Sequence, residues 1–151
     1  MLNHTHPQNR QLIAYYQAQR PDALPFAAAD SVPNTAAYFN LGSHPDIVER
    51  VWEGLGSGLS PDCRAIVYGS PGLVQPQTGV VMVMAYGTQY ALRIPDEFLV
   101  AALERGCKRE QVWAGGHKTD IEAQFGDGWL FGCWAKEETQ WLRATYERLK
   151  N

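Results

Sequence analysis

Residues 79–95 have the sequence GVVMVMAYGTQYALRIP and form the centre of the predicted fold. The run 80–85 is apolar without interruption, which indicates a strand buried on both faces. Residues 89–94 alternate apolar with polar or small side chains, which indicates a second strand buried on one face. Between them, Gly87 suits the first central position of a two-residue turn, where φ must be positive. The stretch therefore predicts a β-hairpin that other elements must cover.

Three helices are predicted to flank the hairpin. Residues 43–55 begin at Ser43, whose hydroxyl can accept a backbone N–H, and Gly56 is placed to end this helix in a left-handed conformation. Residues 96–105 begin with two acidic side chains, which favour the positive end of a helix dipole. Residues 136–150 carry an apolar stripe at helical spacing, which predicts a closing helix with one buried side.

Turn residues and shorter apolar runs predict the rest of the chain. Residues 21–42, with three prolines, indicate an ordered loop with one short helical turn, and 115–128 indicate a polar loop. The other predicted elements are a loose tail over 1–6, a helix over 7–19, and strands over 65–68, 111–114 and 129–134, the first of them stopped by residues 69–72. No linker or repeat divides the chain. Together these elements predict a single α+β domain over 1–151 with a central, mostly antiparallel sheet.

Composition and charge narrow the classes of protein that the chain can be. Its 151 residues suit one domain, with 45% hydrophobic residues to form a core without disulfides or a metal. The formal charge of −3 provides no basic footprint, so we expect no nucleic-acid partner. No apolar run approaches the ~20 residues that span a bilayer, and the start lacks a signal-peptide pattern. We therefore expect a cytoplasmic protein without membrane association.

The three cysteines, Cys63, Cys107 and Cys133, lie far apart without a C-x-x-C pair, which favours reduced thiols over a disulfide framework. Cys133 with His117 and Asp120 has the residue types of a nucleophile, a base and an orienting group. The alternative is that Cys133 packs in its strand as a small apolar residue. The spacing leaves open whether any of the three thiols is reactive.

Two further patterns have plain structural alternatives. Residues 115–119, GGHKT, contain the glycines and the lysine of a phosphate loop. Their spacing differs from that of the nucleotide-binding motif, and an ordinary surface turn explains them. The histidines form no cluster with the spacing of metal ligands, so we expect no metal and no cofactor. They are His4, His6, His44 and His117.

An aromatic segment with acidic neighbours favours a protein interface. Residues 126–134, GDGWLFGCW, are rich in the aromatic residues that anchor interfaces when exposed. The alternative is that Trp129 and Phe131 fill the core between their strand and the last helix. An acidic rim around such a segment would attract a basic partner. The residues predicted to bind a partner lie in the polar loop and are His117, Lys118, Asp120, Glu122 and Asp127.

Two motifs give the chain a resemblance to a known class of proteins. They are YGTQYALRIP over 86–95 and GDGWLFG over 126–132, the second followed by Glu138-x-x-Trp141. In these motifs the chain resembles the small acidic cytosolic proteins that serve as immunity partners of bacterial secreted toxins. The resemblance implies that the protein binds one cognate toxin and occludes its active site, without catalysis of its own. The resemblance assigns no functional residues in this chain.

Three functions are open at this point. An immunity-type inhibitor would need an exposed acidic or aromatic patch, and would bind its cognate protein partner tightly. A small cytosolic enzyme, a hydrolase or transferase using Cys133 or His117, would need a cleft where these side chains converge. A structural or regulatory oligomer would need a large apolar self-interface. The oligomeric state does not follow from the sequence.

Overall fold

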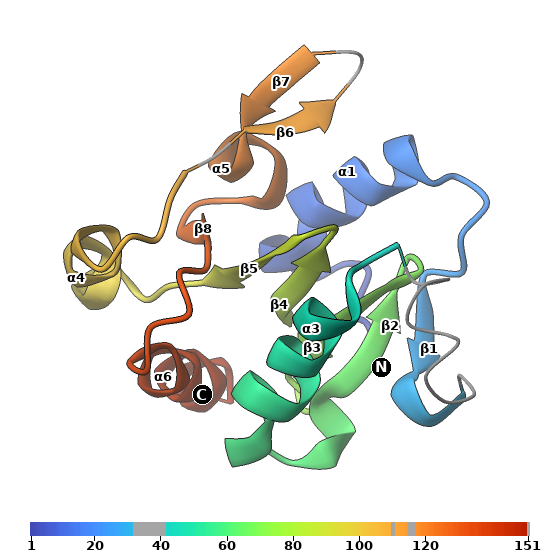
Figure 1. Cartoon of the computed structure of the whole chain (residues 1–151). Helices are drawn as coiled ribbons and strands as arrows, with labels where there is room; N and C mark the ends of the chain where they lie inside the picture. The colour runs from blue at the N-terminus through green and yellow to red at the C-terminus, as the bar shows by residue number, and fades with distance from the viewer. Residues whose placement is uncertain (32–41, 110, 115–116, 151) are drawn as a thin grey trace.

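Six strands form the central sheet of the molecule (Figure 1). The computed structural model describes residues 1–31, 42–109, 111–114 and 117–150. Every neighbouring pair of strands is antiparallel, in the order β1-β2-β3-β4-β5-β8. The strands are β1 (Phe26–Ala28), β2 (Arg64–Val67), β3 (Ser70–Val74), β4 (Val81–Tyr86), β5 (Gln89–Arg93) and β8 (Trp129–Phe131). A separate hairpin pairs β6 (Gln111–Ala114) with β7 (His117–Asp120). The predicted α+β class is confirmed.

The helices are short and several begin or end in turns of other helix types. The α-helices are α1 (Arg10–Gln19), α3 (Pro45–Glu49), α4 (Leu99–Glu104), α5 (Ile121–Phe125) and α6 (Glu138–Leu149). The turns are η1 (Pro7–Asn9), η2 (Ala29–Ser31), η3 (Arg50–Leu55), η4 (Gly56–Gly58), η5 (Pro61–Cys63) and η6 (Asp96–Phe98), of which η3 is a π-helix. The predicted helices over 7–19, 96–105 and 136–150 are confirmed. Within the described ranges, no helix combines the length and apolarity that crossing a bilayer would require.

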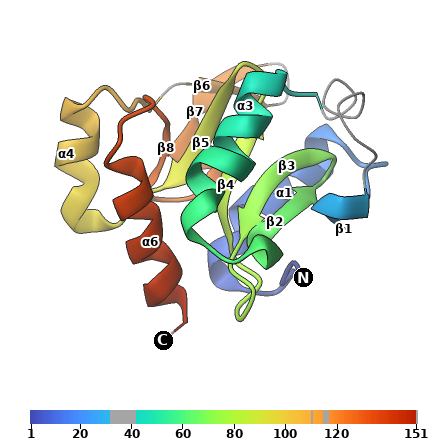
Figure 2. The same ribbon diagram turned by 60° about the horizontal axis from the view of Figure 1, so that its bottom comes forward.

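Helices cover both faces of the sheet, as the buried hairpin requires. In Figure 2, α3 lies in front of the strands with α6 beside it, and α1 lies behind them. On the first face, Ile66, Leu92 and Leu130 pack with the apolar sides of α3, η3 and α6. On the second face, residues of α1 and α5 pack with Trp129 and Phe131. These two aromatic side chains are core residues, as the structural alternative predicted, but they face α1 and α5 rather than the last helix.

The central hairpin forms as predicted, with one difference. Tyr86 pairs with Gln89 across a two-residue turn, and Gly87 has a φ of +64°, as predicted. The first strand contains a β-bulge at Met82, because Val74 of β3 pairs with Val81 while the neighbouring pair skips to residue 83. The second strand is buried on both faces, not one, because α1 and α5 cover the face that carries Ala91.

Of the stretch 69–72 predicted to stop the strand, only Gly69 lies in the turn, because Ser70 to Gly72 already belong to β3. The turn lies one residue earlier, at Tyr68 and Gly69, whose φ values are +48° and +82°. Pro71 then sits inside β3, where it pairs with Ile66 of β2. The pairing of β3 with β4 begins only at Gly72, so the missing N–H of the proline costs no ladder bond there.

The helix over 43–55 is confirmed, with its last residue at Leu55 as predicted, but the capping predicted at Ser43 and at Gly56 is wrong. The N-cap is His44, whose Nδ1 accepts the backbone N–H of Asp46 at 3.1 Å. Ser43 instead forms a β-bridge with Gly87 at the hairpin turn. Gly56 has a φ of −76° rather than a left-handed conformation, since the chain continues into η4.

Of three segments predicted as loose or as loops, the tail over 1–6 is anchored to the sheet and the other two carry regular structure. In the tail over 1–6, Leu2 is 3% exposed, and the backbone N–H of Asn3 donates to the carbonyl of Gly79. The carboxamide of Asn9 stabilises this contact: it donates to the carbonyls of Asn3 and Gly79 and accepts the backbone N–H of Val81. The loop predicted over 115–128 contains β7 and α5. The loop predicted over 21–42 contains β1 and η2, and its residues 32–41 lie outside the described ranges.

Candidate functional site

The chain that leaves β8, residues 132–135, turns around the side chain of Tyr90. The backbone N–H of Gly132 donates to the carbonyl of Tyr90 at 2.8 Å, and the N–H of Trp134 donates to its hydroxyl at 2.8 Å. A Cβ atom on Gly132 would lie 2.0 Å from the tyrosine ring, so only glycine fits this close approach. Trp134 has a φ of +62°, a backbone conformation that residues other than glycine rarely adopt. The segment is thus held in one strained shape against the sheet.

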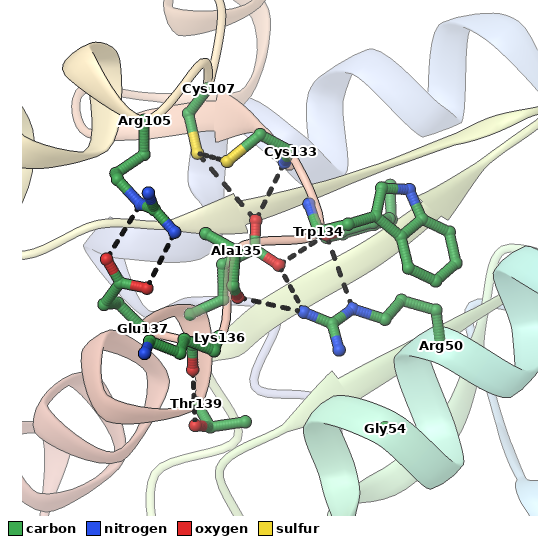
Figure 3. A network of polar contacts seen from close by, with 12 residues as sticks. Arg50, Gly54, Arg105, Cys107, Cys133, Trp134, Ala135, Lys136, Glu137 and Thr139 are labelled. Carbon is green, nitrogen blue, oxygen red and sulfur yellow. Dashed lines mark hydrogen bonds and ion pairs between the residues drawn. The ribbon is translucent and has the colours of Figure 1, made fainter.

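Figure 3 shows a network of polar contacts in this region, with Arg50, Cys107 and Cys133 labelled. Its centre is the carboxylate of Glu138, the first residue of α6, which is 0% exposed. Its Oε1 accepts hydrogen bonds from the Tyr90 hydroxyl and, at 2.6 Å, from Nη2 of Arg50. Its Oε2 accepts the backbone N–H of Cys133 at 2.8 Å. A buried charge with this number of donors is stabilised, whereas removing one donor leaves part of its charge uncompensated.

Arg50 closes the network from the opposite helix. It is the first residue of η3, a π-helix, and such distortions often place side chains at functional sites. Besides Glu138, its guanidinium donates to the carbonyl of Ala135 at 3.3 Å and to the Tyr90 hydroxyl at 3.4 Å. Burial lowers the pKa of the guanidinium, but the hydrogen bonds to Glu138 and Tyr90 outweigh this and raise it. Arg50 is therefore a permanent cation at this point.

The network holds one large aromatic side chain at the surface. Trp134 is 54% exposed, although its ring contacts that of Tyr90 edge to face and lies 5.2 Å from the guanidinium carbon of Arg50. Beside the ring is a shallow hollow of about 450 Å³. Its lining residues are Asp46, Glu49, Arg50, Glu53, Gly54 and Trp134. We call this surface the Trp134 face.

The Trp134 face carries more negative than positive charge. Asp46, Glu49 and Glu53 are exposed on one side of the α3–η3 helix. The positive charge of Arg50 is matched by Glu138 at 2.6 Å. Glu53 has an ion pair with Arg64 at 2.9 Å, which leaves Asp46 and Glu49 to make the face negative. The exposed aromatic ring is therefore bordered by carboxylates, an arrangement that suits a cationic partner.

Two thiols lie behind this face. The Sγ atoms of Cys107 and Cys133 are 3.3 Å apart, and Sγ of Cys107 lies 3.8 Å from Oε2 of Glu138. Both cysteines are free. Burial, followed by the hydrogen bond with Cys133 and the nearby carboxylate, raises the pKa of the Cys107 thiol. Cys107 is therefore a protonated thiol at neutral pH in the absence of a bound cation.

The structure places the residues predicted to bind a partner on a different part of the fold. His117 and Lys118 belong to β7, and Asp127 is exposed in the turn before β8. Asp120 caps α5 by accepting the backbone N–H of Glu122 at 2.8 Å. Lys118, Asp120, Glu122 and Asp127 do not line the hollow beside Trp134. Their role in binding stays a prediction.

Two of these acidic residues have local structural contacts. Glu122 forms an ion pair with Arg109 at 2.5 Å and accepts the backbone N–H of Gly128 at 2.8 Å. It thereby ties α5 to the turn before β8. Together with the helix cap at Asp120, this gives both residues a role in folding.

The predicted grouping of Cys133 with His117 and Asp120 stays a prediction. The contacts of Cys133 in the structure are with Cys107 and Glu138. The side chain of His117 and the glycines of the 115–119 pattern lie outside what the structure describes. A thiol beside a carboxylate is a poor setting for a thiolate nucleophile, because like charges repel.

The sequence did not indicate that Glu138, Arg50 and Tyr90 form one polar network. One signal was present: Glu138 stands in phase with Trp141, Leu142 and the rest of the apolar stripe of α6. A charged residue in the buried phase of an amphipathic helix implies a buried partner. Its partners come from distant parts of the chain and carry no motif of their own.

Comparisons of the chain with protein-family models, with curated proteins and with solved structures find no match. The resemblance to immunity proteins therefore rests on the two sequence motifs. The inhibitor function that it implies is therefore a proposal.

Proposed function

We propose that the protein is an inhibitor that binds one basic protein partner through the Trp134 face, in the manner of an immunity protein that occludes the active site of its cognate toxin. The observation that carries the proposal is the exposed indole of Trp134, held rigidly within a border of carboxylates. Exposed tryptophans are among the residues that contribute most to the affinity of protein interfaces.

Preorganisation of the anchor supports this function. The backbone of Trp134 is fixed by the Tyr90 hydroxyl, and its ring is fixed by Tyr90 and Arg50. A side chain already ordered in the free protein loses little conformational entropy when the partner binds. Burial in the core would stabilise the indole ring, yet the fold keeps Trp134 at the surface in a backbone conformation with positive φ. Strain of this kind is found at functional sites, which supports a role for Trp134 in binding.

Charge supports a basic protein as the partner. The net charge of −3 and the carboxylates of Asp46 and Glu49 attract lysine and arginine side chains, such as those around the active site of an enzyme that acts on nucleic acid. The same charges repel nucleic acid and anionic lipid. Binding at this face is expected to be fast at low salt and slower as salt screens the carboxylates.

The test begins with affinity capture of a partner from the native host, followed by titration of the purified partner with the full chain. We expect a one-to-one complex and loss of the partner's own activity on binding. Trp134→Ala should weaken binding by about 2 kcal/mol or more, or roughly thirtyfold in Kd. Val100→Ala is the matched control, because Val100 is 68% exposed but lies on α4, outside the hollow.

Two further variants separate the possible binding surfaces. Glu49→Lys tests the carboxylate border and should lower the association rate and its dependence on salt. Lys118→Ala tests the surface on β7 predicted from the sequence. If Trp134→Ala binds like the wild type while Lys118→Ala does not, the Trp134 face is not the site. If the partner keeps its activity in the complex, the protein is not an inhibitor.

A further inference from the structure

Two thiols and a carboxylate meet at one point behind the Trp134 face (Figure 3). One donor atom from each of Cys107, Cys133 and Glu138 lies within 4.8 Å of the other two. The three residues come from three elements: Cys107 follows α4, Cys133 follows β8 and Glu138 begins α6. The chain on either side of the first two is tied together, since Lys108 and Phe131 exchange backbone hydrogen bonds. The donor atoms are therefore held in place by the fold.

The spacing fits a tetrahedral metal ion. With Zn–S bonds of about 2.3 Å and a Zn–O bond of about 2.1 Å, tetrahedral geometry separates two sulfur ligands by about 3.8 Å and sulfur from oxygen by about 3.6 Å. The distances here are 3.3 Å between the Sγ atoms and 3.8 Å from Cys107 Sγ to Glu138 Oε2. Each differs from the tetrahedral value by no more than about 0.5 Å, which a small side-chain rotation closes.

Hydrogen bonds hold the carboxylate of Glu138 in the orientation that a metal ligand requires. Oε1 of Glu138 is occupied by Arg50 and Tyr90, and the N–H of Cys133 donates to Oε2. These hydrogen bonds fix the plane of the carboxylate and direct Oε2 toward the sulfur atoms. Outer hydrogen bonds of this kind orient the ligands of known metal sites.

Charge balance also favours a divalent cation. The negative charge of Glu138 is matched by Arg50. When a divalent ion binds, each thiol releases one proton to the solvent, and the two thiolates match the charge of the ion. The filled site therefore adds no net charge to a buried region, which removes the main cost of placing an ion there.

We propose that Cys107, Cys133 and Glu138 bind one zinc-like transition-metal ion, with water as the fourth ligand. Two sulfur ligands select a soft or borderline ion over magnesium or calcium, which require oxygen ligands. Cys133 is partly exposed, so the ion has a route from solvent. The ion would join the ends of α4, β8 and α6 next to Trp134. This site does not depend on the proposed inhibitor function.

Cobalt is the probe, because thiolate-bound Co²⁺ has a charge-transfer band in the near ultraviolet. The full chain, reduced and kept free of oxygen, is titrated with Co²⁺ and then with Zn²⁺. We expect the band to saturate at one equivalent of cobalt and to disappear as zinc displaces it. Cys107→Ser and Cys133→Ser should lose the band. Cys63→Ser should keep it, because Cys63 is a buried thiol in η5 and is not part of the cluster.

A second measurement uses the wild-type protein alone and so does not depend on the folding of variants. Thiol labelling followed by peptide mass spectrometry should show that Zn²⁺ protects Cys107 and Cys133 but leaves the labelling of Cys63 unchanged. Glu138→Gln should weaken zinc binding by about tenfold or more. The proposal is overturned if excess cobalt produces no thiolate band, if Cys107→Ser keeps the band, or if zinc protects neither cysteine of the pair.

Discussion

Replacing Tyr90 with phenylalanine would remove one oxygen atom from the polar network beneath Trp134 and keep the ring. That oxygen donates to the buried carboxylate of Glu138 and accepts the backbone N–H of Trp134 at 2.8 Å. A hydrogen bond to a charged group contributes about 1.5–3 kcal/mol, and leaving a buried N–H unpaired costs about 1–3 kcal/mol. Because Glu138 keeps Arg50 and the N–H of Cys133, we expect a loss of about 2–3 kcal/mol in the free energy of unfolding.

Tyr16→Phe is the matched control for this variant. The ring of Tyr16 is also buried, at 2% exposure, but its hydroxyl has no hydrogen-bond partner among the described residues. Removing a buried hydroxyl that makes no hydrogen bond relieves a desolvation cost, so this variant should be neutral or slightly stabilised. The two substitutions delete the same atom from equally buried rings, and only the network differs.

Urea denaturation followed by tryptophan fluorescence measures both effects, and thermal melts provide a second measurement. At about 2–4 °C per kcal/mol for a chain of this length, Tyr90→Phe should lower Tm by about 4–12 °C. The fluorescence of Trp134 should also change in the folded state, since its backbone anchor is lost. If Tyr90→Phe is no less stable than Tyr16→Phe, the network does not hold the segment 132–135 in place, and the argument from preorganisation fails.

Two further variants test the same region. Arg50→Ala should cost about 3–5 kcal/mol in the free energy of unfolding, because it leaves a buried carboxylate without its cation. Arg105→Ala, which breaks an ion pair that is half exposed, should cost less than about 1 kcal/mol; equal losses in urea denaturation would argue against a buried ion pair. Gly132→Ala should cost about 3 kcal/mol or more, because its Cβ would overlap a buried ring. Gly87→Ala meets no atom within 4 Å and should cost only about 1–2 kcal/mol for its positive φ, so calorimetry should find it the more stable of the two.

Local chemistry explains which parts of the fold could be predicted. The turn at Gly87, the apolar run before it and the apolar stripe of α6 each depend on residues close together in sequence. Predictions failed where a neighbour in space changed the outcome. Pro71 and Gly72 indicate a turn, but their place between β2 and β4 makes them part of a strand. The tail over 1–6 is polar, yet the hydrogen bonds of Asn9 hold it on the sheet.

The candidate site could not be predicted for the same reason. The hairpin, the helices that cover it and the aromatic segment at its edge follow from local pattern, because periodicity and turn residues are local properties. The packing of the fold brings Arg50 to Glu138, 88 residues away, and Cys107 to Cys133, 26 residues away. It also decided that Trp129 is buried while Trp134 is exposed. The strand order and the turn around Tyr90 decide these contacts, because the close approach of distant side chains depends on how the elements pack.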